Sequence, residues 1–125
     1  MIYESYVYPY VRRNLRRRYP KEKGWKIFHQ DDRVGDIVDF VVERRNRRGV
    51  VERVIVEVKK VTRLTWEHVN QVNRYTRNLT GGNTRIVEKI LVVPSGSDVR
   101  EVPSDFSIMY LKSFQCIGNR ISHKI

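Results

Sequence analysis

Two segments of the chain combine apolar, mostly β-branched residues with isolated charges, and a basic connection joins them. The first segment runs from Gly35 to Glu43, and the second runs from Val54 to Lys60. Val, Ile and Phe favour strands, and Gly49 in the polar connection favours a turn. The pattern therefore predicts a β-hairpin that folds about residues 46–49.

Three charged side chains of this hairpin are predicted to share one face. Side chains alternate between the two faces of a strand, and folding about the basic turn puts Asp39 opposite Glu57. Lys59 follows two residues later on the same face. The other face is predicted to carry the apolar residues Val38, Phe40, Val42, Val54, Val56 and Val58.

Two carboxylates beside a lysine form a recognisable chemical set. Such carboxylates can hold a hard divalent ion such as Mg²⁺, which keeps water molecules and accepts a phosphate oxygen. A nearby lysine can orient the attacking water and stabilise developing charge. The alternative is an ordinary surface ion pair between Glu57 and Lys59, and those two residues alone do not separate the interpretations.

The segments around the hairpin follow helical or strand periodicity. A helix is expected over residues 64–79, with Thr62 or Thr65 as its N-cap. Another is expected from about Ile2 to Tyr19, where Pro9 either kinks the helix or lies in the first turn of a shorter one. Further strands are predicted at residues 25–28, 84–93 and 106–111, and residues 113–125 follow neither period.

The charge of the chain favours a polyanionic partner. It has 25 Lys and Arg against 14 Asp and Glu, a formal net charge of +11, and nucleic acid is the leading candidate partner. No apolar run approaches the ~18 residues of a membrane span, so we expect a soluble cytoplasmic protein without a membrane partner. The residues predicted to contact nucleic acid are Arg12, Arg13, Arg16, Arg17, Arg45, Arg47 and Lys60.

Length and the remaining reactive residues narrow the possibilities further. A chain of 125 residues is expected to form a single domain over residues 1–125. Its one cysteine, Cys116, excludes an internal disulfide and a zinc site built on several thiolates. The three histidines have no ligand spacing and no nucleophile elbow is present, so covalent catalysis by a triad is not predicted.

The order of these charged residues resembles the core motif of the PD-(D/E)XK nuclease superfamily, an acid on one strand and Glu-x-Lys on the next. Glu57-Val58-Lys59 matches the second half of the motif. The first half lacks its Pro-Asp pair and leaves two candidates. Asp36 follows a small residue, as the motif aspartate often does, but alternation favours Asp39. Many members also carry Gln-x-x-x-Tyr in the next helix, which Gln71 and Tyr75 match.

This resemblance implies a fold and an activity. The fold is a mixed α/β, restriction-endonuclease-like sheet of four to five strands flanked by helices, with an αβββαβ core. The activity is hydrolysis of phosphodiester bonds, with DNA favoured over RNA. Asp39 and Glu57 would hold Mg²⁺ or Mn²⁺ with the carbonyl of Val58, Lys59 would activate water, and Gln71 would orient water or phosphate. Glu4 and Asp36 are additional candidate acids.

Two other functions remain open from sequence alone. One is a non-catalytic nucleic-acid-binding module with the same fold, and the other is a subunit whose basic face binds an acidic protein. No extra element is available to read bases, so selectivity is expected to depend on the shape of the nucleic acid. A homodimer would present two sites to a branched substrate, and the residues expected to form its contact are Phe106, Ile108, Met109 and Leu111.

Overall fold

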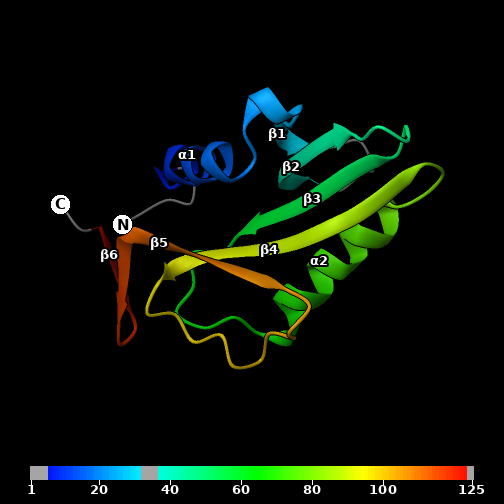
Figure 1. Cartoon of the computed structure of the whole chain (residues 1–125). Coiled ribbons are helices and arrows are strands. Elements are labelled where there is room, and N and C mark those ends of the chain that lie inside the picture. Colours follow the sequence, from blue (N-terminus) through cyan, green and yellow to red (C-terminus); the bar gives the residue numbers. More distant parts are fainter. Residues whose placement is uncertain (1–5, 32–36, 124–125) are drawn as a thin grey trace.

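The computed structural model describes residues 6–31 and 37–123 of the chain (Figure 1). Its two α-helices are α1 (Tyr8–Arg18) and α2 (Trp66–Leu79), and a short 3₁₀ turn, η2, covers Lys21–Lys23. Its strands are β1 (Lys26–Asp31), β2 (Val38–Arg45), β3 (Val51–Val58), β4 (Thr84–Ser95), β5 (Ser107–Ile117) and β6 (Arg120–His123).

All the strands belong to one mixed sheet, in the order β1-β2-β3-β4-β5-β6. The first three form an antiparallel meander, β4 and β5 run parallel to β3, and β6 returns antiparallel to β5. A parallel neighbour needs a crossover, and α2 supplies the one between β3 and β4. The predicted mixed α/β fold with its αβββαβ order is confirmed.

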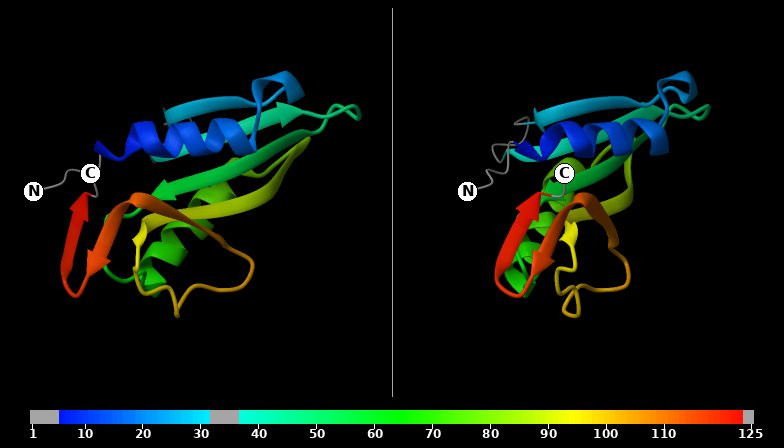
Figure 2. Two further views of the ribbon diagram at one scale, coloured as in Figure 1. Left: turned by 60° about the vertical axis from the view of Figure 1, so that its left-hand side comes forward. Right: turned by 90° about the vertical axis from the view of Figure 1, so that its left-hand side faces the viewer.

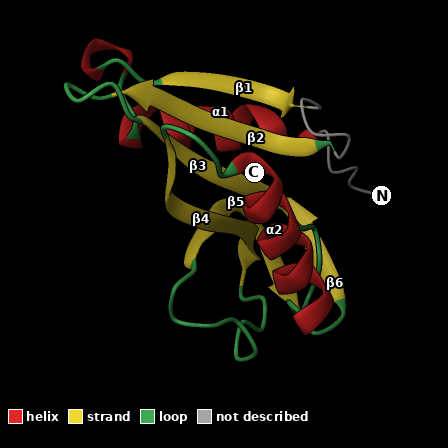
Figure 3. Cartoon of the chain, turned by 90° about the vertical axis from the view of Figure 1, so that its right-hand side faces the viewer, coloured by secondary structure: helices red, strands yellow, loops and turns green. Residues whose placement is uncertain are grey.

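The two helices cover opposite faces of the sheet, as Figure 3 shows. Val11 and Leu15 of α1 are fully buried in one apolar cluster, and Val69 and Val72 of α2 are fully buried in another. Strand β4 contributes to both clusters by alternation, so it is covered on both faces as its apolar run predicts. Within the described residues, no helix is long and apolar enough to cross a membrane.

The helix α1 is shorter than predicted, and Pro9 explains where it starts. Pro9 occupies the first turn, where the missing proline N–H would have no helical acceptor in any case. Residues 1–5, on which the earlier part of the prediction falls, lie outside the described residues.

The hairpin has the predicted turn and register. The N–H of Asn46 donates to the Val50 carbonyl at 2.8 Å, and the N–H of Gly49 donates to the Asn46 carbonyl at 3.0 Å. Phe40 pairs with Val56, so the next position along each strand places Asp39 opposite Glu57 as predicted.

One apolar residue of the hairpin departs from strict alternation. Val38 packs in the cluster under α2, with Val41, and not with Phe40 under α1. Its partner strand is irregular here, because Gln30 has a left-handed φ of +53° between two paired residues of β1. A distorted ladder explains why the first residue of β2 turns to the other face.

The C-terminal part of the chain adds more strand than predicted. Residues 113–125 supply the end of β5 and all of β6, so the sheet has six strands and not four to five. The loop Gly118-Asn119 joins Ile117 directly to Arg120, and Gly118 has the positive φ that such a tight hairpin requires. Figure 2 shows β5 turning sharply, so that its second half and β6 stand apart from the rest of the sheet.

The apolar stretch that was expected to form a dimer contact is buried inside the chain itself. Phe106 is 8 % exposed, Met109 9 % and Leu111 2 %, and Ile108 packs partly buried against the cluster under α2. Their own fold covers these side chains, so the prediction that they form the contact between two copies is wrong.

Gly96 packs closely against the backbone of β5, and Gly118 provides a matched control for a test of that contact. Both have a left-handed φ, +88° and +60°, but a Cβ on Gly96 would lie 2.8 Å from the Cys116 carbonyl oxygen and one on Gly118 would meet nothing within 4 Å. We expect Gly118→Ala to lower the free energy of unfolding by about 1–2 kcal/mol from its φ alone, and Gly96→Ala to lower it further. Urea denaturation measures both, and equal losses would contradict the steric argument.

Candidate active site

Asp39 lies where the ladder between β2 and β3 ends. The last pair on that ladder is Phe40 with Val56. One step beyond, Asp39 Oδ2 accepts a hydrogen bond from the N–H of Val58 at 2.8 Å, and Oδ1 accepts one from the hydroxyl of Tyr8 at 3.0 Å. The carboxylate therefore takes the place of a backbone carbonyl as the acceptor for the N–H of Val58, and it is bound by both β3 and α1.

Glu57 faces this carboxylate from β3 and is 4 % exposed. Burial, together with hydrogen bonding and negative charge from Asp39, raises the pKa of Glu57 to about 9, and the charge of Lys59 opposes that rise. Its Oε2 is buried and has no hydrogen-bond partner among the described residues. A buried carboxylate oxygen left unpaired is costly, so this atom marks a place where a cation would be stabilised.

Lys59 follows the last residue of β3 and belongs to the same group. Its Nζ lies 4.0 Å from Glu57 Oε1, and its backbone N–H donates to the Val92 carbonyl of β4 at 2.8 Å. The backbone is thus fixed by a neighbouring strand. At 4.0 Å the ammonium only partly compensates Glu57 and keeps donors for another ligand.

The backbone of Val58 faces the same space. In an extended strand the N–H and C=O of one residue point to the same side. Because the N–H of Val58 is bound to Asp39, its carbonyl is directed toward the β2 side as well. One backbone oxygen and two carboxylates are the hard oxygen donors that suit Mg²⁺ or Mn²⁺.

These donors fit a divalent ion that is shared with a substrate. Among the described residues, no group of three His, Cys, Asp or Glu side chains could hold a metal. Asp39 and Glu57 therefore form a pair of acids and not part of a larger cluster among those residues. Mg²⁺ is commonly held by one or two carboxylates and completed by water and phosphate oxygens.

His68 is a residue that the sequence analysis missed. Its Nδ1 accepts a hydrogen bond from the backbone N–H of Thr65 at 3.0 Å, completing a capping box at the start of α2. The ring proton is then on Nε2. Burial and the positive charge of Lys59 lower the pKa of His68, with Glu67 opposing, so a neutral imidazole lies close to Lys59. The Thr-x-x-His spacing was the available signal, with histidine in place of the usual Glu or Gln.

Gln71 lies on α2 three residues after His68, on the same side of the helix. It is half-buried and makes no side-chain hydrogen bond within the described residues. Tyr75 is buried in the cluster under α2. The two other candidate acids, Glu4 and Asp36, lie outside the described residues.

The basic residues of α1 form its solvent face. Arg12, Arg13 and Arg17 are exposed. Arg16 differs, because it is half-buried and donates to the Trp25 carbonyl at 3.2 Å. Its first role is therefore to fix the connection between α1 and β1.

The basic residues of the hairpin lie far from the acidic pair. Arg45 and Arg47 are at the turn, and Arg45 donates to the Gly49 carbonyl at 3.0 Å. At ~3.3 Å per residue, the turn is about 20 Å along the strand from Asp39. Lys60, by contrast, directly follows Lys59 and is half-buried.

A cavity of about 500 Å³ opens beside Asp39, on the side of α1 that faces β1. The ring of His29 stacks on Phe40 with centroids 4.5 Å apart, and Tyr8 contacts both rings edge-on. Arg12 also lines this cavity. The hydroxyl that binds Asp39 therefore belongs to an aromatic wall.

The model of one protein family, the PD-(D/E)XK nuclease superfamily, matches residues 3–87, well over half of the chain. The chain belongs to this superfamily. The matched span contains Asp39, Glu57, Lys59 and Gln71, and ends within β4, before β5 and β6 begin.

Two solved structures show a weaker likeness to the chain. A repair endonuclease from Pyrococcus abyssi is 25 % identical over 78 % of this chain and 44 % of its own, with a TM-score of 0.46. An EndoMS complex with dsDNA is 22 % identical over 78 % of this chain and 41 % of its own, with a TM-score of 0.44. The chain thus spans less than half of either protein. A search of curated proteins found no match.

The raised pKa of Glu57 leads to a prediction about stability without metal. Because its pKa is raised above 4.5 in the folded state, the folded protein binds more protons than the unfolded one, so its stability should fall as pH rises from about 4.5 toward 9. Glu57→Gln removes the charge and keeps the shape. We expect this variant, in EDTA at pH 8, to melt several degrees above the unsubstituted protein, since ~1 kcal/mol corresponds to about 4–8 °C in a small domain.

The same two proteins provide the control for that measurement. Addition of Mn²⁺ should raise the melting temperature of the unsubstituted protein and leave Glu57→Gln nearly unchanged, because a ligand stabilises only the state that binds it. A Glu57→Gln variant that melts lower than the unsubstituted protein in EDTA would show that Glu57 is already well paired.

Proposed function

We propose that the chain is a metal-dependent nuclease that hydrolyses phosphodiester bonds, with DNA as the favoured substrate. The single observation that carries the proposal is the pair Asp39 and Glu57, buried face to face, with one oxygen of Glu57 unpaired. Membership of a nuclease superfamily supports the same assignment.

Asp39, Glu57 and the carbonyl of Val58 would hold one or two Mg²⁺ or Mn²⁺ ions. Such an ion, when bound, lowers the pKa of a water ligand and neutralises charge on the phosphate. Tyr8 holds Asp39 in place through Oδ1. The N–H of Val58 does the same at Oδ2, so the chain fixes the carboxylate before any ion arrives.

Lys59 would position the attacking water and stabilise negative charge on the phosphate. In hydrolysis the water oxygen bonds to phosphorus, the bond from phosphorus to one sugar oxygen breaks, and a proton passes from the water to that leaving oxygen. The ammonium of Lys59, 4.0 Å from Glu57 Oε1, has three donors for these oxygens. Gln71, a helical turn from the neutral His68, would orient water or phosphate.

The basic surface supports a nucleic-acid substrate. A net charge of +11 favours association with a polyanion, and most of the affinity for nucleic acid comes from contacts to phosphates. The contacts proposed here are Arg12, Arg13, Arg16, Arg17, Arg45, Arg47 and Lys60. A pair of such chains would place two active sites on one substrate.

The first test of this function is cleavage by the Lys59→Ala variant. We expect the rate at saturating substrate to fall by about 10²–10⁴-fold, as for loss of a group that assists proton transfer or charge stabilisation. Affinity for uncleaved substrate in EDTA should change little, because it depends on dispersed Arg and Lys contacts. A panel of single strands, duplexes, flaps, four-way junctions and RNA, each with Mg²⁺ and Mn²⁺, identifies the substrate.

Lys26→Ala is the matched control for this test, since Lys26 is an exposed lysine on the edge strand β1. It should cleave at the unsubstituted rate. Full activity in Lys59→Ala would end the nuclease assignment. Binding without cleavage on every substrate of the panel would favour a non-catalytic nucleic-acid-binding module instead.

A second test decides which aspartate binds the metal. Asp39→Asn should abolish Mn²⁺ binding in calorimetric titration, whereas Asp36→Asn should weaken it little. The reason is that Asp39 faces Glu57 across the hairpin, and without substrate phosphate its loss leaves the ion only one of the two carboxylates of the site. The reverse result would assign the metal to Asp36 and remove Asp39 from the site.

A further inference from the structure

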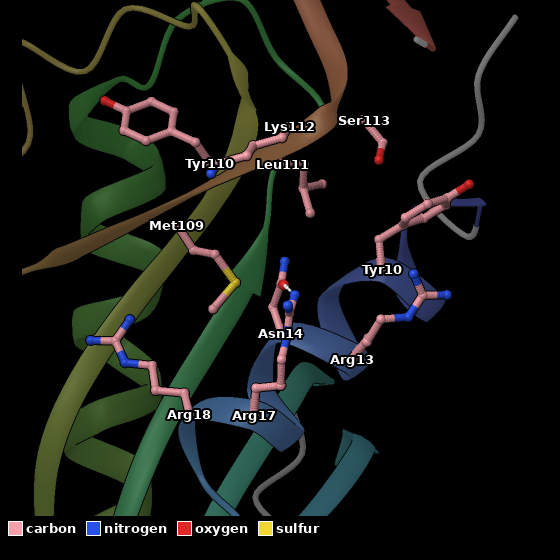
Figure 4. Close-up of a pocket in the computed structure, with 10 residues that line it drawn as sticks. All are labelled: Tyr10, Arg13, Asn14, Arg17, Arg18, Met109, Tyr110, Leu111, Lys112 and Ser113. Atoms are coloured by element: carbon pink, nitrogen blue, oxygen red, sulfur yellow. Dashed lines mark hydrogen bonds between the residues drawn. The ribbon is translucent and has the colours of Figure 1, made fainter. Parts of the chain in front are cut away.

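A groove of about 440 Å³ lies between α1 and β5 and is separate from the acidic pair. Figure 4 shows its two walls. Tyr10, Asn14 and Arg17 line it from α1, and Met109 and Leu111 point into it from β5. We call this space the α1–β5 groove.

The charge of the α1–β5 groove is positive. Arg13, Arg17 and Arg18 line it, and none of its lining residues is acidic. Arg18 is paired with Glu88. Arg13 contacts the ring of Tyr10, and Arg17 donates to Asn14, so neither guanidinium is bound to a carboxylate within the described part of the chain. Planar guanidinium groups with unused donors suit phosphate oxygens.

The β5 wall presents backbone as well as side chains. Five consecutive residues, 109–113, line the groove, although Tyr110 points away from it in Figure 4. Residues 109–111 of β5 pair with β4, whereas β6 pairs with β5 only from Phe114 onward. The other edge of residues 109–113 is therefore unpaired within the described sheet, and its N–H groups can bind an extended ligand.

The groove and the acidic pair share the first turn of α1. Tyr8 donates to Asp39, and Tyr10, two residues later, lines the groove. Two residues correspond to a rise of about 3 Å and a rotation of about 200°, so the groove and Asp39 lie at the same level of α1 but on different sides of it. The β5 wall is also level with the end of β3, because Val58 pairs with Val92 and Val92 pairs with Met109.

From these observations we propose that the α1–β5 groove binds one strand of nucleic acid through its sugar-phosphate backbone and leads it toward Asp39. The identity of the ligand rests on the proposed nuclease function. Arg13 and Arg17 bind the phosphates of this strand. A space of this volume is the size of a small-molecule site, which holds a short stretch of one strand. The substrate class is therefore nucleic acid with a single-stranded segment, such as a flap, a fork or a single strand.

The test is a binding measurement with no metal present. The probe is a fluorescent oligothymidylate of about 20 nucleotides, longer than the segments that single-strand-binding domains usually cover. The groove variant is Arg13→Gln with Arg17→Gln, because glutamine keeps helix propensity and removes the charge. We expect at least a tenfold loss of affinity for this strand, and a salt dependence that weakens by about 0.7 in log–log slope for each phosphate contact removed.

The matched control is Arg77→Gln with Arg120→Gln, two exposed arginines on α2 and β6 that lose the same charge away from the groove. It should lose no more than about threefold, from long-range charge alone. Arg13→Lys with Arg17→Lys should fall between the two, since lysine keeps charge without the planar fork. Thermal melts show whether each variant is folded.

Three results would overturn the proposal. The first is an equal loss of affinity in the groove variant and the control, which would mean that binding depends on the overall positive charge and not on the groove. The second is a loss of affinity for a hairpin duplex of the same length that is as large, in the groove variant, as the loss for the single strand. It would mean that the groove does not select one strand. The third is displacement of the strand by polyglutamate of equal charge, with polyglutamate binding depending more strongly on Arg13 and Arg17 than strand binding does. It would identify an acidic protein as the partner. Cleavage is measured separately with Mn²⁺. If the unsubstituted protein binds the oligothymidylate through Arg13 and Arg17 but cleaves no substrate, the proposed function is overturned and the proposed binding is not.

Discussion

A pair of carboxylates buried face to face is the constraint on which the rest of this structure depends. Burial and the negative charge of Asp39 raise the pKa of Glu57 to about 9, and leaving a buried charge unpaired costs several kcal/mol. The fold meets part of that cost with a strand amide, a tyrosine hydroxyl and a nearby ammonium. These three groups come from β3, from α1 and from the residue after β3, so the two layers and the hairpin must all be formed before the pair is tolerated.

The same constraint explains why α1 begins where it does. Its first turn carries a proline that suits a helix start and a tyrosine that reaches Asp39. Two residues further on, Tyr10 faces the opposite wall. One helical turn therefore links the acidic pair to the basic surface. The long cationic face of α1 lies beside the carboxylates and not on a remote part of the molecule.

Much of this arrangement could be predicted from sequence, because it depends on short-range rules. Alternation along two strands and a basic turn were enough to put Asp39, Glu57 and Lys59 together, and the order of elements predicted the αβββαβ core. The tight loop Gly118-Asn119 was also readable as a hairpin turn. It was missed because the strands that flank it are short and of mixed polarity.

Other features depend on tertiary contacts that no local pattern contains. The residues of β5 that looked uncovered, Met109 and Leu111, are covered by α1, which lies about ninety positions earlier in the chain. Val38 changes face because of a backbone irregularity in a neighbouring strand. His68 is different, because its cap partner Thr65 is three residues away and the Thr-x-x-His spacing is a local signal.

The alternating burial of β4 has a consequence for how the molecule holds together. Ile90 and Val92 belong to the cluster under α1, and Leu91 and Val93 belong to the cluster under α2. Neither layer can open without disturbing the strand that the other layer packs on. The two cores therefore share one strand, and we expect local unfolding to begin at the edge strands β1 and β6. Lys59, two residues after Glu57, donates its N–H to Val92 of that shared strand, so the acidic pair is built on a well-packed support.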